Sequence, residues 1–288
     1  DLSAGQQRNL EESLDCRVMS RTELILHIFA DRARTYEGQM QVELAQLKHA
    51  QTRLVRGWTH LDRQKGGIGL RGAGETQLEL DQRMLGERIK TTERRLQDVS
   101  RRRQLGRRRR QRSHTRTVSL VGYTNAGKST LFNRLTAADV LSEDKLFATL
   151  DPTLRRLPIA GIGEVVLADT VGFISQLPHS LIEAFKATLE EVANADLLLH
   201  VVDASAPDRE QYVAEVNSVL REIGAQELPI IMVWNKSDLV ASDTTSAAEI
   251  APFPGVAVSA VTGEGLDALQ VRIADILGVT SPTEVTLP

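Results

Sequence analysis

The chain has 288 residues, of which 41% are hydrophobic and 25% charged, so it is long enough for one or two domains with substantial cores. This composition excludes global disorder, and the single cysteine, Cys16, excludes a disulfide framework and is typical of a reducing, cytoplasmic location. The net charge of -3 combines two unequal halves, because residues 1–116 carry +10 and residues 117–288 carry -13. This asymmetry predicts two domains with different partners, and the basic half is the candidate for binding nucleic acid.

Two apolar stripes within the basic half predict a pair of long helices. The first recurs every three or four residues from Met40 to Leu61, and the second runs from Leu78 to Val99. Between them, residues 65–74 contain five glycines, which disfavours both helix and sheet. We therefore expect an antiparallel helical hairpin over residues 31–116, with a flexible, cationic loop at its tip.

Arginines are concentrated toward the end of this half. Eleven fall within 23 residues: Arg94, Arg95, Arg101, Arg102, Arg103, Arg107, Arg108, Arg109, Arg110, Arg112 and Arg116. Like charges three or four residues apart repel each other on a helix, and bound phosphate relieves that repulsion. Because aromatic residues make up only 4% of the chain, base stacking is disfavoured and contact with structured RNA is predicted. The alternatives are an acidic protein groove or a peripherally contacted anionic membrane; DNA is not expected.

The strongest motif lies at the start of the acidic half. It follows the apolar residues 118–121, precedes a predicted helix, and fits the phosphate-loop pattern with Gly122, Tyr123, Thr124, Asn125, Ala126, Gly127, Lys128 and Ser129. The glycines let backbone N–H groups turn toward phosphate oxygens, and the helix N-terminus favours an anion. Lys128 then supplies a positive charge, and the Ser129 hydroxyl is placed to bind Mg²⁺.

Candidate ligand-binding segments, each beginning with a polar residue, follow three further predicted strands, at 165–168, 230–234 and 256–258. They are Asp169, Thr170, Val171 and Gly172 after the first, Asn235, Lys236, Ser237 and Asp238 after the second, and Ser259, Ala260 and Val261 after the third. Strands alternating with helices predict an α/β fold with a mostly parallel sheet, whose carboxyl edge binds the ligand. An Asp238 carboxylate can accept from the two adjacent donors of guanine, which adenine lacks, so GTP and GDP are the expected nucleotides.

The segment between the phosphate loop and Asp169 supplies a candidate switch, comprising Phe147, Ala148, Thr149, Leu150 and Asp151. A switch threonine brings its hydroxyl to magnesium and its N–H to the γ-phosphate. We favour Thr149, and Thr153 is the alternative. Phe173 follows Gly172 where many small GTPases have a water-orienting Gln, which predicts slow hydrolysis by the isolated chain.

The motifs, in this order, resemble those of the translational GTPase-like class of P-loop proteins. By that resemblance, Asn235 and Lys236 brace the base and a neighbouring loop, and the backbone near Ser259 contacts the guanine oxygen. The resemblance also implies that Asn125 holds K⁺ near the β,γ bridge; the alternative is a residue suited to a turn. His200, at the expected end of a strand over residues 197–203, is interpreted as structural.

The whole chain resembles the HflX family of ribosome-associated GTPases. The resemblance depends on the GTPase motifs and on residues 8–11 (RNLE), 21–26 (RTELIL), 28–30 (IFA), 42–47 (VELAQL), 66–69 (GGIG) and 71–75 (RGAGE), where Ala73 replaces an expected Pro. It implies a truncated α/β N-terminal remnant over residues 1–30, a GTPase domain over 117–279, and a tail over 280–288. It also implies binding to the large ribosomal subunit and its RNA, and GTP-dependent separation of stalled ribosomes into subunits. We expect the chain to be a monomer.

Overall fold

The structure, a computed structural model, describes residues 2–57, 73–112, 115–137, 147, 149–174, 186–240 and 254–279. The chain divides into two compact units. The first contains residues 1–104 and 178–185, and the second contains residues 105–177 and 186–288. None of the described helices combines the length and apolarity needed to cross a bilayer.

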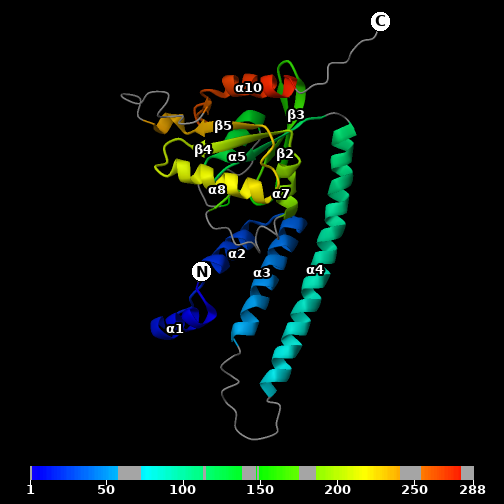
Figure 1. Cartoon of the computed structure of the whole chain (residues 1–288), viewed down its shortest axis with the longest axis vertical. Coiled ribbons are helices and arrows are strands. Elements are labelled where there is room, and N and C mark those ends of the chain that lie inside the picture. Colours follow the sequence, from blue (N-terminus) through cyan, green and yellow to red (C-terminus); the bar gives the residue numbers. More distant parts are fainter. Residues whose placement is uncertain are drawn as a thin grey trace. The chain divides into compact units, whose positions relative to one another are not determined.

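The first unit is helical in its described residues. Its helices are α1 (Ala4–Leu14), α2 (Arg21–Arg32), α3 (Tyr36–Gly57) and the greater part of α4 (Ala73–Arg112), all drawn in Figure 1. Helices α1 and α2 each begin at a serine, Ser3 and Ser20, whose side chain accepts a backbone N–H of the first turn. Gln6 and Glu23 accept the cap N–H in return, which completes a capping box at both helices. The α/β remnant expected over residues 1–30 thus contributes helices and no strand within residues 2–30.

Helices α3 and α4 lie side by side and run in opposite directions (Figure 1). Leu44 and Leu47 of α3 form a buried cluster with Ile89 of α4, to which the partly buried Leu85 and Leu96 add. The two apolar stripes therefore lie on helices that pack together. Residues 58–72, which include most of the expected glycine-rich loop, lie outside the described residues.

The second unit contains a six-stranded sheet in the order β2-β3-β1-β4-β5-β6. The strands are β1 (Thr117–Val121), β2 (Thr153–Ile159), β3 (Gly163–Asp169), β4 (Leu197–Asp203), β5 (Ile230–Asn235) and β6 (Gly255–Ala257). All neighbouring strands pair in parallel except β2, which pairs antiparallel with β3. The five parallel strands confirm the predicted α/β fold, whereas the antiparallel edge strand β2 was not predicted.

Helices cover both faces of this sheet (Figure 1). Helices α5 (Lys128–Thr136) and α10 (Leu266–Val279) pack into one large core with Leu197, Leu199 and Val201 of β4. On the other face lie α7 (Lys186–Ala193) and α8 (Arg209–Glu222), with Val213 of α8 packed against Val202 of β4. Because side chains alternate along a strand, His200 of β4 lies on the α8 side of the sheet.

Candidate functional site

The loop from Gly122 to Gly127 connects β1 to α5 and takes a backbone form that needs its glycines. Gly122 has φ +150°, and a Cβ there would lie 2.2 Å from the carbonyl oxygen of Val201. Gly127 has φ +88° and is the N-cap of α5, with no side-chain hydrogen bond to the first turn. The N–H groups that open α5 are therefore not capped by the Gly127 position and are available to an anion.

Lys128 is buried beneath this loop, only 6% exposed. Its Nζ donates to the carbonyl oxygens of Gly122, at 3.1 Å, and Tyr123, at 2.8 Å. Burial lowers the pKa of Lys128 to about 8, although the carboxylate of Asp169 acts in the opposite direction. A desolvated ammonium group beside the N-terminus of a helix is suited to form an ion pair with phosphate.

Three oxygen-bearing side chains from separate segments meet beside the start of α5. The hydroxyls of Ser129 and Thr149 lie 2.7 Å apart, and the Thr149 hydroxyl donates to Asp169 Oδ2 at 2.8 Å. Asp169 is fully buried at the end of β3, and its Oδ1 has no hydrogen-bond partner among the described residues. Burial raises the pKa of Asp169, while the hydrogen bonds from Ser129 and Thr149 lower it. Hydroxyl and carboxylate oxygens, one of them unpartnered, fit the ligand preference of Mg²⁺.

The two candidate switch threonines occupy different surroundings. Thr149 belongs to the oxygen cluster just described, whereas Thr153 opens β2 opposite Asp169 in the antiparallel ladder. Phe147 has a left-handed backbone, and its N–H donates to the Thr124 hydroxyl at 3.2 Å. Leu150 is buried and Asp151 is partly exposed, while Ala148 lies outside the described residues.

The segment after Asp169 is bonded to the phosphate loop through the backbone. The Thr124 N–H donates to the Phe173 carbonyl at 2.7 Å, and the Phe173 N–H donates to the Gly122 carbonyl at 3.1 Å. A Cβ at Gly172 would lie 2.8 Å from the Cα of Thr124, so only glycine permits this approach. The Phe173 ring is 2% exposed and cannot orient a water molecule. Thr170 and Val171 are also buried, and Thr170 donates its hydroxyl proton to the Leu120 carbonyl.

Asn235, at the end of β5, ties two loops together. Its Nδ2 donates to the Ala126 carbonyl at 2.9 Å, and its Oδ1 accepts the Ala260 N–H at 3.0 Å. Lys236 forms an ion pair with Asp203 at 2.6 Å, with its backbone in the left-handed region. The 3-10 turn Ser237–Leu239 then presents Asp238 as an exposed carboxylate.

The loop after β6 is closed by its own hydrogen bonds. The Ser259 side chain accepts the Thr262 N–H at 3.1 Å, and Arg134 of α5 donates to the Thr262 carbonyl at 3.2 Å. Ser259 and Ala260 are buried, whereas Val261 is 71% exposed. The carboxyl ends of β1, β3, β5 and β6 thus bring the predicted residues to one edge of the sheet.

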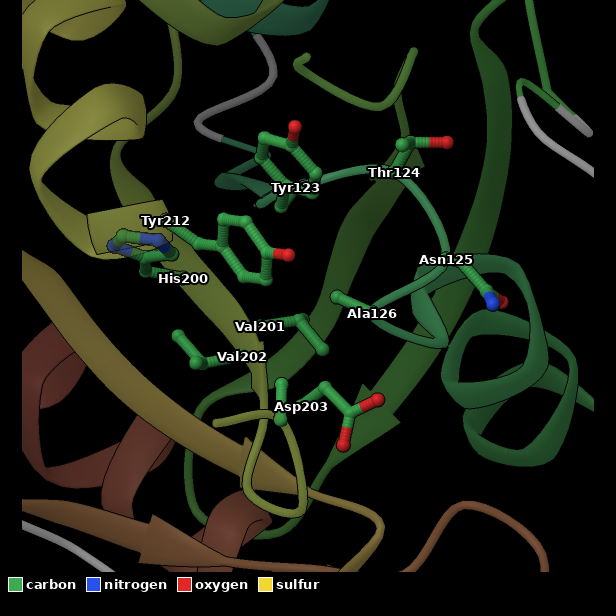
Figure 2. A pocket seen from close by; sticks show the side chains of 10 residues that line it. Tyr123, Thr124, Asn125, Ala126, His200, Val201, Val202, Asp203 and Tyr212 are labelled. Carbon is green, nitrogen blue, oxygen red and sulfur yellow. The ribbon is translucent and has the colours of Figure 1, made fainter. Parts of the chain in front are cut away.

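Sequence reasoning missed an aromatic pair beside the phosphate loop. The rings of Tyr123 and Tyr212 of α8 stack with centroids 4.1 Å apart and planes 14° from parallel (Figure 2). They line a cavity of about 270 Å³ together with Asn125, His200 and Asp203, among others. His200 lies within β4 rather than at its end, fully buried, and neither ring nitrogen has a hydrogen-bond partner among the described residues. Burial, and secondarily the charge of Lys128, lowers its pKa to about 4, so the ring is neutral at pH 7.

Comparisons with known proteins agree with this geometry. Three family models match: "GTP-binding GTPase N-terminal" over residues 1–30, "GTP-binding GTPase Middle Region" over 32–110, and "50S ribosome-binding GTPase" over 117–236. The GTPase HflX of Escherichia coli (strain K12) is 62% identical over 239 residues, which cover 83% of this chain and 56% of that protein. The chain belongs to the GTPase HflX family. The GTPase HflX of Magnetococcus marinus is 56% identical over 278 residues, which cover 96% of this chain and 64% of that protein.

The chain therefore spans about 56% to 64% of the length of these two HflX relatives. The fold has a solved counterpart in a GTP-binding protein from the archaeon Sulfolobus solfataricus in complex with GDP. The two share 24% sequence identity with a TM-score of 0.58, over 98% of this chain and 79% of the other. At this identity the likeness confirms the P-loop GTPase fold, while the roles of individual residues stay predictions.

Proposed function

We propose that the chain binds GTP and GDP with Mg²⁺, hydrolyses GTP slowly by itself, and is stimulated by the large ribosomal subunit. The observation that carries the proposal is the cluster of Ser129, Thr149 and Asp169 oxygens beside the phosphate loop and the buried Lys128. The family's description as a 50S ribosome-binding GTPase supports the choice of partner.

Each residue has a defined task in this proposal. The α5 N-terminus and Lys128 bind the phosphates, and Ser129 and Thr149 hold Mg²⁺ with Asp169 as their hydrogen-bond acceptor. Mg²⁺ held by these residues would supply positive charge to offset the negative charge of the phosphates during phosphoryl transfer. Asn235 holds the phosphate loop and the Ala260 backbone in place relative to each other, while Asp238 accepts hydrogen bonds from guanine. Gly172 allows the segment after Asp169 to approach the γ-phosphate.

The switch assignment has a matched test. We expect Thr149→Ala to slow single-turnover GTP hydrolysis by about tenfold or more, because the hydroxyl beside Ser129 is lost. Thr153→Ala, which removes a hydroxyl from the β2 side of Asp169, is expected to stay within about twofold of the unaltered chain. The reverse order would move the switch role to Thr153.

Guanine selection is tested at Asp238. We expect Asp238→Asn to lose most of the preference for GTP over ATP, because an amide cannot accept from both guanine donors. Competition of GTP and ATP against a fluorescent GDP analogue measures that preference. An unchanged preference would contradict the assignment of guanine selection to Asp238.

Slow basal hydrolysis follows from Phe173, whose buried ring leaves water positioning to another group or to a partner. Asn125 has φ +62°, a backbone form that suits a turn residue, and its side chain is exposed and therefore accessible to K⁺. We propose the K⁺ role. The rate of GTP hydrolysis should then be higher in KCl than in NaCl, and Asn125→Ala should abolish the difference. Equal rates in the two salts would mean that Asn125 serves only as a turn residue.

We further propose that GTP-dependent binding to the large subunit separates stalled or stress-inactivated ribosomes into subunits. GTP would order the switch segment, and loss of the γ-phosphate would release the protein. By linkage, the GTP form should bind large subunits more tightly than the GDP form. Light scattering of ribosomes mixed with the protein and GTP should decrease as subunits separate. Unchanged scattering with intact GTP-dependent binding would favour the second candidate, a GTP-timed RNA-binding assembly factor, which the exposed arginines of α4 also suit.

A further inference from the structure

The middle of the phosphate loop is connected to three functional segments through two residues. The Tyr123 carbonyl accepts from Lys128, the Thr124 N–H donates to Phe173, and the Thr124 hydroxyl accepts from Phe147. A displacement of this part of the loop would therefore disturb the phosphate-binding lysine, the segment after Asp169 and the switch segment together.

On the side that faces β4, this part of the loop borders a cavity. The cavity has a volume of about 270 Å³ and is lined by loop residues, by His200 to Asp203 of β4 and by Ala206 and Tyr212. A wall that borders empty space lacks packing contacts on that side. His200 on the cavity wall offers no hydrogen bond to a described residue.

Beside this cavity, the ring of Tyr123 in the loop stacks on the ring of Tyr212 in α8 (Figure 2). Tyr212 stands in the first turn of α8, and α8 is fixed to the sheet by the buried Val213 and Val216. The stack therefore connects the phosphate loop to a helix that is anchored in the core.

We propose that Tyr212 is a positioning residue that preorganises the phosphate loop for nucleotide binding by stacking on Tyr123. The inference rests on the proposed nucleotide binding and deepens it. Tyr212 stabilises the binding-competent loop before the nucleotide arrives, and bound phosphates then hold the loop by themselves. A smaller competent fraction raises the apparent Kd in proportion, without changing the chemistry of the occupied site.

The inference predicts a split between affinity and rate. Tyr212→Leu should raise the Kd for GDP about 3- to 10-fold, the range expected for an aromatic stack, while single-turnover hydrolysis at saturating GTP stays within about twofold. Tyr212→Phe keeps the ring and should restore the Kd. Gln211→Leu, at the neighbouring exposed position of α8, is the matched control and should bind GDP normally.

A double-mutant cycle assigns the effect to the stack. Tyr123→Leu alone and the double variant should bind GDP as weakly as Tyr212→Leu, because the same contact is lost each time. Urea denaturation checks the fold of each variant, and Tyr123→Leu reads the contact from the loop side if Tyr212→Leu is poorly folded. Additive effects, an unchanged Kd, or a loss confined to the saturated rate would overturn the inference. Failure of the unaltered chain to bind GDP would instead overturn the proposed function, and this inference with it.

Discussion

At the scale of single residues, the site depends on polar side chains that the fold withdraws from water. Lys128, Asp169 and His200 are each no more than 6% exposed. Burial lowers the pKa of Lys128 and His200 and raises that of Asp169, which favours the neutral form of each side chain. Phosphate and Mg²⁺ are the groups that would compensate Lys128 and Asp169 in the proposed function. His200 has no such compensation and makes folding sensitive to acid.

The folded pKa of His200, about 4, lies below the ordinary value of 6.5, so between these values the unfolded chain binds the extra proton. Its contribution to stability is complete above pH 6.5 and is lost as the pH falls toward 4. The unfolding free energy should decrease when the pH is lowered from 7 to 5. We expect this decrease to be about 2 kcal/mol smaller in His200→Leu than in the unaltered chain. Urea denaturation at the two pH values measures this; the same loss in both proteins would contradict it.

Alanine substitutions at two glycines with the same backbone angle distinguish the effect of backbone strain from the effect of a steric clash. Gly127 and Gly161 both have φ +88°. A Cβ added at Gly127 would lie 2.2 Å from Asn235 Nδ2, whereas a Cβ added at Gly161 would have no neighbouring atom within 4 Å. We expect Gly161→Ala to cost about 1 kcal/mol of stability with normal GDP affinity. Gly127→Ala should also weaken GDP binding about tenfold or more, because the Asn235 amide must move. Equal GDP affinities of the two variants would refute the role given to Asn235.

The sequence identified most site residues because they follow apolar strands or fit a fixed motif spacing. It could not choose between Thr149 and Thr153, since the choice depends on how the segment folds back toward Ser129 and Asp169. It also missed Tyr212, whose partner Tyr123 is 89 residues away in sequence and is met only through packing of α8.

At the scale of elements, the strands β1, β3, β4 and β5 were predictable because each contains a run of apolar residues. Strand β2 was not, because this edge strand exposes Arg155 and Arg156 and contains Pro158. Only its Leu157 and Ile159 are buried, and that pattern is too short to predict a strand. Helix α4 followed from its apolar stripe, and the hairpin expected over residues 31–116 already included the arginine-rich segment through which its 40 residues continue.

The packing of α3 on α4 has its own test. Ile89 is 8% exposed between Leu44 and Leu47, whereas Met84 on the same helix is 60% exposed. We expect Ile89→Ala to cost about 2 to 4 kcal/mol in the first unit, and Met84→Ala about 0.5 kcal/mol or less. Hydrogen exchange should accelerate in α3 and α4 but not in β1 and β4. Equal protection in the two variants would mean that the cluster does not hold this pair together.

At the scale of the whole molecule, the two halves of the chain carry opposite net charges, which suit different partners. The residues before 117 carry +10 and those after carry -13. Arg94, Arg95, Arg101 and Arg102 of α4 are exposed, and such a surface attracts a polyanion. In the proposed function the acidic half binds the nucleotide, and its negative charge repels phosphate backbones except where a specific contact forms. Our central claim is that binding of a polyanion by the basic half controls GTP hydrolysis in the acidic half.

Single-turnover GTP hydrolysis with and without large ribosomal subunits tests this claim most directly. It is measured for the unaltered chain and for variants with Arg107 to Arg110 changed to Gln. Arg155, Arg156, Arg221 and Arg272, four exposed arginines of the second unit, are changed to Gln as the charge-matched control. We predict slow hydrolysis alone, marked stimulation by the subunit, and loss of that stimulation only when Arg107 to Arg110 are neutralised. Fast hydrolysis without subunits, or undiminished stimulation of the Arg107 to Arg110 variant, would contradict the account.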